Sequence, residues 1–179
     1  LARHGQRPEA PEFAEAMVDD LLWLQGDGVL GDDPAIVAGL GFVDGAPVAV
    51  LGARRRGAPG ARRGGDAATG MRKARRLCAL AERFALPLIS FIDRPAREAA
   101  AGPSSGREAA ALADALATLP TPTIGVLCGE LSGLESLALA ACRHLLAMEH
   151  AVLAPAAAEE VAARLFDAPA SLADAARVT

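Results

Sequence analysis

The sequence contains few of the residues from which metal sites and aromatic-lined sites are built. It has no tyrosine and one tryptophan, and aromatic residues make up 3% of its 179 residues. Its three histidines are scattered, and it has neither a Cys-x-x-Cys pair nor a His-Glu-x-x-His pattern. Because protein zinc sites need such clustered ligands, we expect no metal site.

Long apolar runs and paired cysteines are absent as well. No run reaches the roughly 20 apolar residues that span a bilayer, and no secretory signal peptide is visible. Cys78, Cys128 and Cys142 lie singly in apolar patterns, which favours reduced, buried thiols in a cytoplasmic protein. The net charge of −4 provides no overall attraction to nucleic acid or to a membrane, so we expect neither as a partner.

Small and aliphatic residues are abundant instead. Apolar residues make up 52% of the chain, which predicts a globular domain with a core of Ala, Leu and Val. No repeat or second domain is evident, so we interpret residues 1–179 as one domain. The basic residues are concentrated, because residues 54–76 hold nine Arg or Lys and one acid.

Hydrophobic periodicity predicts helices that alternate with strands. Two apolar runs, 35–43 and 46–53, flank Asp44-Gly45, which is a strong signal of a β-hairpin. Continuous apolar runs predict buried strands at 86–93 and 121–129, and one or two short strands within 145–155. Helices are expected at 9–24, 70–85, 107–118, 134–144, 157–166 and 171–177. This alternation indicates an α/β fold built from βαβ units.

Two loops are candidates for a binding site, because ligands of such sheets bind beyond the carboxyl ends of the strands. The first runs from Asp93 to Gly106 and the second from Gly129 to Gly133. A glycine-bearing turn before a helix presents free N–H groups that can stabilise an oxyanion. Ser132 stands one place too late for a Gly-x-Ser-x-Gly nucleophile elbow, so a helix N-cap is the simpler role.

The sequence suggests roles for three other polar residues. Glu130 could cap the following helix or transfer a proton. Asp93, at a predicted strand end, is expected to accept hydrogen bonds from nearby backbone amides. His144 is most simply a partner for the dipole at the end of the predicted 134–144 helix.

Four segments, in order, resemble one family: the α subunit of bacterial acetyl-CoA carboxylase carboxyltransferase. The similarity runs from residue 1 to about residue 166, and its first two segments are the most specific. The segments are "LARHGQRP", "DDPAIVAGLGFVDGAPVAVLG", "GMRKARRLCALAERFALPLISFID" and "GVLCGE".

The resemblance implies a crotonase-type fold, a spiral of ββα units that packs two nearly perpendicular sheets. It implies transfer of a carboxyl group from carboxybiotin, on a biotin carboxyl carrier protein, to an acyl-CoA thioester such as acetyl-CoA. The product would be malonyl-CoA, which supplies fatty acid or polyketide synthesis. It also implies a β-type partner subunit with a zinc ribbon, in an α2β2 assembly, and no tightly bound cofactor on this chain.

The resemblance also implies which residues form the site. The catalytic segment would comprise Gly129, Glu130, Ser132, Gly133 and Leu134. The substrate-binding residues would be Arg54, Arg55, Arg56, Asp93, Pro95 and Gly102. The three arginines could attract CoA phosphates or the carrier protein, or could simply be solvated.

Both site loops depart from the family pattern. Only Pro95 remains of the family's first loop, and Leu131-Ser132 and Leu134-Glu135 replace glycine pairs in the second. Side chains there are expected to hinder close approach of a ligand to the backbone. Two alternatives therefore stand beside an active carboxyltransferase subunit. One is a degenerate α-like partner that stabilises a β-type subunit. The other is a biotin-independent acyl-CoA decarboxylase that uses Glu98, Glu130 or His150 as acid or base.

Overall fold

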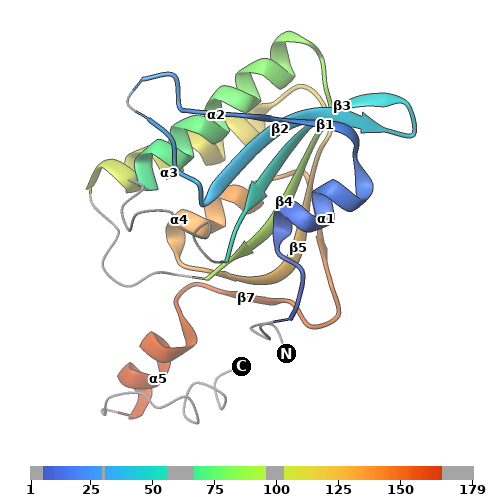
Figure 1. The fold of residues 1–179 in the computed structure, drawn as a ribbon. Coiled ribbons are helices and arrows are strands. Elements are labelled where there is room, and N and C mark those ends of the chain that lie inside the picture. Colours follow the sequence, from blue (N-terminus) through green and yellow to red (C-terminus); the bar gives the residue numbers. More distant parts are fainter. Residues whose placement is uncertain (1–5, 30, 56–66, 96–102, 167–179) are drawn as a thin grey trace.

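A computed structural model describes residues 6–29, 31–55, 67–95 and 103–166 (Figure 1). Its elements alternate much as the sequence predicts. In chain order they are α1 (Ala10–Met17), β1 (Asp19–Leu24), β2 (Ile36–Val43), β3 (Ala46–Ala53), α2 (Ala67–Arg83), β4 (Leu88–Arg94), α3 (Pro103–Thr118), β5 (Thr123–Ser132), α4 (Leu134–Leu137), the 3-10 helix η1 (Ala138–Ala140), β6 (His144–Ala147), β7 (Val152–Ala154) and α5 (Ala158–Phe166).

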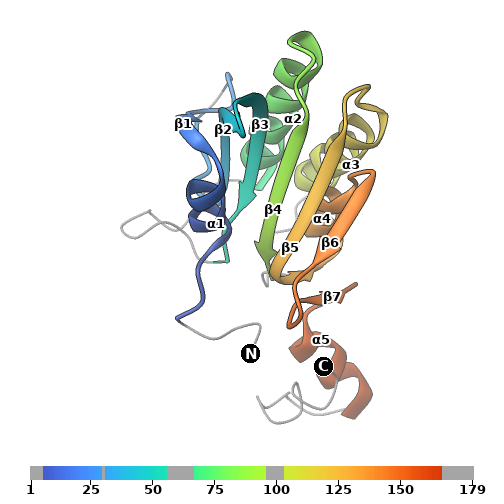
Figure 2. The same ribbon diagram turned by 90° about the vertical axis from the view of Figure 1, so that its right-hand side faces the viewer.

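The strands form one seven-stranded sheet in the order β1-β2-β3-β4-β5-β6, and β7 also pairs with β5. β2 pairs antiparallel with both β1 and β3, whereas β3, β4, β5 and β6 run parallel to one another. The long strand β5 pairs with β6 through Ile124–Leu127 and with β7 through Glu130–Ser132. The sheet therefore branches at β5, where Figure 2 shows β7 lying below β6.

The predicted hairpin is confirmed. β2 and β3 pair without interruption from Ile36 opposite Ala53 to Val43 opposite Ala46. Asp44 and Gly45 both have positive φ, 49° and 77°. A two-residue turn with positive φ at both positions matches the twist of the strands, which explains why Asp-Gly carries the signal.

The predicted helix over 9–24 is wrong in its second half. α1 ends at Met17, and Asp19–Leu24 forms β1, which pairs antiparallel with β2. Gly39 of β2 makes this pairing possible, because a Cβ there would meet the Leu22 carbonyl oxygen at 2.9 Å. The apolar residues recur at helical spacing, but pairing with β2 outweighs that short-range preference.

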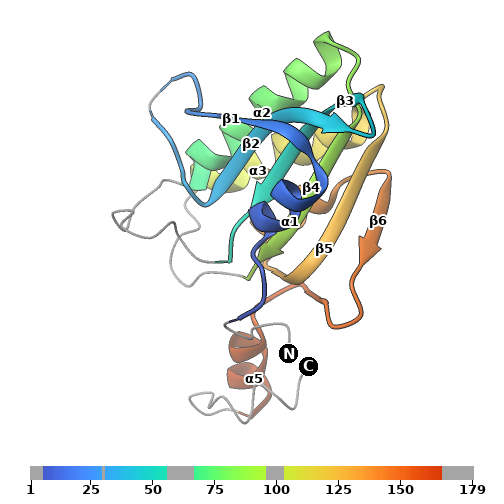
Figure 3. The same cartoon turned by 45° about the vertical axis from the view of Figure 1, so that its right-hand side comes forward.

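Helices cover both faces of the sheet, as Figure 3 shows. α2, α3 and η1 lie on one face, and α1 packs against β3 and β4 on the other. The larger core cluster lies beneath α2 and α3, with Ile36, Leu51, Met71, Leu112, Leu127, Leu131 and Leu139 among its members. The smaller cluster lies beneath α1 and includes Ala14, Val50, Phe91 and Cys128. This layering leaves the carboxyl ends of the central strands at one edge.

The remaining predictions concern the boundaries of elements. α3 begins at Pro103 rather than 107, and α2 at Ala67 rather than 70. The helix predicted at 134–144 is wrong after Ala140, since His144 begins β6 and pairs with Ile124 instead of ending a helix. Arg143 redirects the chain there by donating from its backbone N–H to Thr123 Oγ1 at 2.8 Å. The short strands and the 157–166 helix are confirmed as β6, β7 and α5.

The predicted helix at 171–177 lies outside the described residues. Within the described residues, no helix has the length and apolar character needed to cross a membrane. The described histidines, cysteines and acidic residues also form no group of three that could hold a metal ion.

Candidate functional site

The carboxyl ends of β3, β4 and β5 bring three charged residues together. Arg55 follows β3, Asp93 stands near the end of β4, and Glu130 lies near the end of β5. All three are nearly buried: the side chains of Arg55 and Asp93 are 8% and 1% exposed, and Glu130 is 4% exposed. Arg55 Nη1 lies 3.5 Å from Asp93 Oδ2. Buried charges at the ends of three parallel strands mark this edge as the candidate site.

A bulge in β5 shapes this edge. Ile92 is paired with Leu127 and Arg94 with Leu131, so Asp93 alone faces the three residues of β5 between them. Two backbone groups in this bulge bind side chains from elsewhere. The Glu130 N–H donates to Asp93 Oδ1 at 3.0 Å, and the Cys128 carbonyl accepts a hydrogen bond from Arg7 Nη2. Bulges commonly redirect side chains next to active sites, and this one is held by two charged residues.

Asp93 is the centre of the cluster. Burial raises the pKa of its carboxyl above the ordinary value, although the Glu130 amide and the charges of Arg55 and Arg7 act in the opposite direction. The carboxyl also packs directly on Gly129. A Cβ at Gly129 would lie 2.5 Å from Asp93 Cγ and 2.7 Å from Oδ2. Glycine is therefore needed at 129 for close approach of the carboxylate.

The expected turn over Gly129–Gly133 is largely wrong. β5 continues to Ser132, because Glu130, Leu131 and Ser132 pair with Val152, Leu153 and Ala154 of β7. Only Gly133 leaves the strand, with φ 83° and ψ 146° as N-cap of α4. Residues with a side chain rarely adopt that conformation, which explains why glycine stands at position 133.

Ser132 does not cap the helix as predicted. Its hydroxyl donates to Glu130 Oε1 at 2.9 Å, and both residues are buried. The backbone N–H of Glu130 donates to the Asp93 carboxylate, which fixes the main chain at this residue. The two polar residues of β5 are thus held in a buried arrangement, and neither is presented as an isolated nucleophile or helix cap.

Leu131 does not lie in the path of a ligand as expected. It is 0% exposed and belongs to the larger core cluster. Alternation along a strand sends its side chain to the face opposite Glu130 and Ser132. Leu134 begins α4.

The other predicted site residues differ in burial, and some of them lie outside the described residues. Arg54 is half-buried, and its backbone N–H donates to the Ala35 carbonyl oxygen at 2.9 Å. Pro95 follows β4 and is half-buried, whereas His150 is exposed. Arg56, Glu98 and Gly102 lie outside the described residues.

Sequence reasoning missed Arg7 as a site residue. The residue stands in "LARHGQRP", a segment that carries the family resemblance but has no feature that marks a site residue. Arg7 lies just before Pro8 and Glu9, the N-cap of α1, where a charged residue is ordinary. Its long-range contact with Cys128, 121 residues away in sequence, has no local signal.

The three cysteines are free, as predicted from their spacing. Burial is the main cause that raises the pKa of Cys78 to about 12 and those of Cys128 and Cys142 to about 11. Since the thiolate is the reactive form, these thiols are poor nucleophiles at neutral pH.

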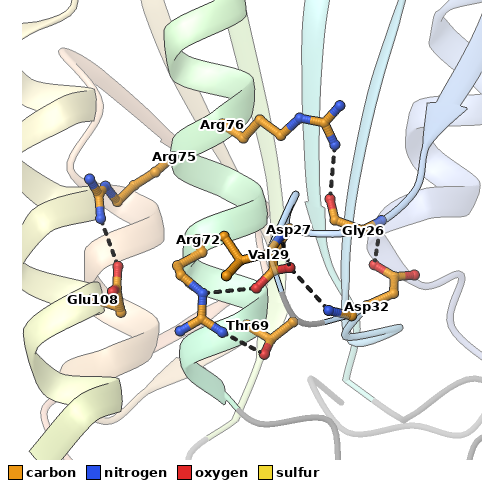
Figure 4. A network of polar contacts seen from close by, with 10 residues as sticks. Gly26, Asp27, Val29, Asp32, Thr69, Arg72, Arg75, Arg76 and Glu108 are labelled. Atoms are coloured by element: carbon orange, nitrogen blue, oxygen red, sulfur yellow. Dashed lines mark hydrogen bonds and ion pairs between the residues drawn. The ribbon is translucent and has the colours of Figure 1, made fainter.

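A second polar network lies on the outer side of α2 (Figure 4). Arg72 Nε lies 2.8 Å from Asp27 Oδ2, and Arg75 Nη1 lies 2.7 Å from Glu108 Oε2. Arg76 donates to the carbonyl oxygens of Gln25 and Gly26, both at 3.2 Å. These contacts tie α2 to α3 and to the β1–β2 connection, so Arg72, Arg75 and Arg76 have structural partners.

Comparison with known proteins identifies the family. The family model described as acetyl co-enzyme A carboxylase carboxyltransferase-like matches residues 1–179. The α subunit of the acetyl-coenzyme A carboxylase carboxyl transferase of Carboxydothermus hydrogenoformans is 36% identical over 181 residues, which cover 93% of this chain and 54% of that protein. A protein of Salinispora tropica named as subunits beta/alpha is 37% identical over 184 residues, 99% of this chain and 32% of its own length. The chain thus spans about half, or less, of these relatives.

Solved structures agree with the crotonase-type fold predicted from the resemblance, although the described strands form one sheet that branches at β5 and not the two nearly perpendicular sheets expected. Transcarboxylase 12S matches with a TM-score of 0.73 and 17% identity, covering 90% of this chain and 34% of its own. A Pseudomonas malonate decarboxylase hetero-tetramer in complex with malonate matches with a TM-score of 0.69 and 17% identity, covering 88% and 64%. At this identity the similarity establishes the fold, which the carboxyltransferase and decarboxylase share.

The motif order, the sheet with its layered helices and the family match over the whole chain agree. The chain belongs to the acetyl co-enzyme A carboxylase carboxyltransferase-like family.

Proposed function

We propose that this chain is the α-type part of an acyl-CoA carboxyltransferase, which transfers a carboxyl group from carboxybiotin on a carrier protein to an acyl-CoA thioester. The observation that carries the proposal is the buried cluster of Arg55, Asp93 and Glu130 at the carboxyl ends of β3, β4 and β5. Family membership supports it, because relatives over this length are named as α subunits of the carboxyl transferase.

The transfer breaks the bond between the carboxyl carbon and the ureido nitrogen of biotin. It forms a carbon–carbon bond to the α-carbon of the thioester, whose proton passes to that nitrogen. Negative charge develops on the thioester oxygen as the proton leaves, so fixed positive charge and N–H groups nearby would favour the reaction. We propose that Arg55 supplies the charge and that the segment Gly129–Leu134 faces the thioester.

Asp93 and Glu130 would have supporting roles in this scheme. Asp93 holds the Arg55 guanidinium at 3.5 Å and the Glu130 amide at 3.0 Å. Each contact restricts a group that would otherwise move, and orientation of reacting groups contributes strongly to rate. The half-buried Arg54 lies next in the chain and would extend the positive charge toward the CoA phosphates.

We further propose a β-type partner that covers the C-terminal strands. β6 is an edge strand with four exposed residues, and Leu145 and Leu146 are 41% and 58% exposed. Leu153 of β7 is 55% exposed. An uncharged, apolar edge strand is a ready surface for a partner. A relative that joins beta and alpha parts in one chain is consistent with such pairing.

Reconstitution tests the proposal. The full chain, a β-type subunit and a biotin carrier protein bearing ¹⁴C-carboxybiotin would be mixed with acetyl-CoA or propionyl-CoA, and label in the acyl-CoA would be counted. We expect labelled malonyl-CoA or methylmalonyl-CoA, and a loss of about 10²–10³-fold in rate for Arg55→Gln. Arg164→Gln is the matched control, since the Arg164 side chain is 78% exposed and pairs with Glu160, one helical turn before it.

A non-catalytic α-like partner is the second candidate. Two observations favour this candidate. The Glu130 N–H already donates to Asp93, and Leu131 and Ser132 pair with β7. Both interactions engage backbone groups that an oxyanion would need. A complex that forms with the β-type subunit and yields no labelled acyl-CoA would support this candidate and contradict the first.

A further inference from the structure

The segment before α1 reaches the same edge of the sheet as the candidate site. Gln6–Glu9 leads into α1, which packs against β3 and β4 on the face opposite α2. Figures 1 and 2 show this segment running from α1 toward the end of the sheet where β4 and β5 finish. Residues at the start of the described chain therefore meet residues near the middle of the sequence.

Arg7 makes contacts with two strand ends from this position. Its guanidinium donates through Nη2 to the carbonyl oxygen of Cys128 in the β5 bulge. Its own carbonyl oxygen accepts a hydrogen bond from Arg55 Nη2 at 3.4 Å. The side chain thus contacts β5 and the main chain contacts the residue after β3. The bulge is consequently held on one side by Arg7 and on the other by Asp93.

We propose that Arg7 is a positioning residue, which holds the β5 bulge at Cys128–Glu130 and so sets Glu130 and Ser132 relative to Arg55. Its catalytic consequence rests on the proposed carboxyl transfer. Its structural part, the holding of the bulge, does not.

The chemistry of the contact explains why an arginine suits this place. Cys128 is 0% exposed, so its carbonyl would be costly to leave without a donor. The guanidinium is a planar fork with five N–H donors and a delocalised charge, which is more weakly hydrated than an ammonium group. It can therefore bind the buried carbonyl while its charge also favours the ionised form of Asp93.

A purely structural anchor would not change the titration of the site. Among the described residues, the charges of Arg55 and Arg7 lower the pKa of Asp93, whereas burial and the charge of Glu130 raise it. Removal of the Arg7 charge should raise the Asp93 pKa further. A raised Asp93 pKa in a variant without the Arg7 charge would therefore show that Arg7 acts on the site. A general loss of stability would not raise this pKa.

The test compares Arg7→Ala, Arg7→Lys and the control Arg164→Ala in the full chain, with three readouts. Hydrogen exchange of the Glu130 amide reports on the bulge, and ¹³C NMR of the Asp93 carboxyl reports on its titration. Carboxyl transfer with the β-type subunit gives kcat and KM. These readouts do not depend on one another, so each part of the inference is checked separately.

For Arg7→Ala we expect the Glu130 amide to exchange at least about tenfold faster and the Asp93 pKa to rise. We expect kcat to fall by up to about a hundredfold, and KM for the thioester to change by less than about twofold. Arg7→Lys should restore the Asp93 titration, because it restores the charge, and should recover exchange protection only in part. Should Arg7→Ala fail to fold, Arg7→Gln, which also removes the charge but keeps an N–H donor, replaces it in the titration and kcat readouts, and Arg7→Lys still reports on exchange of the Glu130 amide.

Wild-type exchange and wild-type Asp93 titration in Arg7→Ala would overturn the inference. So would a fall in kcat no larger than that of Arg164→Ala. Absence of transfer by the wild-type complex would instead refute the proposed function and with it the effect on kcat. In that case exchange and titration still decide whether Arg7 holds the bulge.

Discussion

Replacement of Gly129 by alanine probes the closest contact of the candidate site. The new Cβ would lie 2.5 Å from Asp93 Cγ and 2.7 Å from Asp93 Oδ2. Real Cβ atoms do not approach other atoms so closely, so the carboxyl must rotate or β5 must shift. Either movement disturbs the 3.0 Å hydrogen bond from the Glu130 amide and the 3.5 Å contact with Arg55.

The expected cost follows from these two contributions. Overpacking in a tightly packed interior costs about 1–3 kcal/mol. Loss of a buried hydrogen bond to a charged group costs about 1.5–3 kcal/mol. Because rotation of the carboxyl relieves part of the overlap, we expect Gly129→Ala to lower the free energy of unfolding by about 2–5 kcal/mol.

Urea denaturation followed by the fluorescence of Trp23, the chain's one tryptophan, measures this change. Gly106→Ala is the matched control, because Gly106 lies in α3 with nothing within 4 Å of an added Cβ. There alanine should stabilise the helix by about 0.5–1 kcal/mol.

A double-mutant cycle with Asp93→Ala assigns the cost to the Asp93 carboxyl. In that background the added Cβ meets no carboxylate, so the cost of Gly129→Ala should shrink by more than about 1 kcal/mol. An equal cost in both backgrounds, or a Gly129→Ala protein within about 0.5 kcal/mol of wild type, would refute the reasoning.

Three further predictions concern single residues. Burial raises the Asp93 pKa above 3.8, so the native state binds this proton more tightly than the unfolded chain. The free energy of unfolding should therefore fall as pH rises from 3.8 through the raised native pKa. Urea denaturation at several pH values should show this fall in the wild-type protein, and the contribution of Asp93 should be absent from Asp93→Asn. Leu131→Ala should cost about 2–5 kcal/mol in the same melts and create no activity, because Leu131 lies in the core; gained activity would contradict this. Leu146→Lys should change stability by less than about 0.5 kcal/mol yet weaken binding of the β-type subunit in sedimentation experiments; unchanged binding would place the interface elsewhere.

Local sequence signals predicted several elements correctly because their causes are local. The β2–β3 hairpin follows from Asp44-Gly45, where both residues adopt positive φ. Strand β4 follows from a continuous apolar run, since a strand buried on both faces needs no polar alternation. The family resemblance, which rests on ordered motifs, gave the fold class that the structural comparisons confirm.

Two of the failed predictions concern segments whose conformation is decided by pairing with another strand. Residues 19–24 have helical spacing but pair with β2, and Glu130–Ser132 extend β5 because β7 pairs with them. In both places the segment could satisfy its backbone hydrogen bonds in more than one way. The partner strand that selects one way is not visible in the segment itself.

The amino-acid sequence alone therefore specified the class of fold, the family and the edge of the sheet at which to look. It also indicated Asp93 and Glu130, which follow from their place at strand ends. Only the tertiary structure brought Arg7 to Cys128, packed Asp93 on Gly129 and buried Leu131 in the core. The physical reason is range: hydrophobic periodicity and turn chemistry act over a few residues, whereas these contacts depend on the register of the sheet and on the bulge in β5.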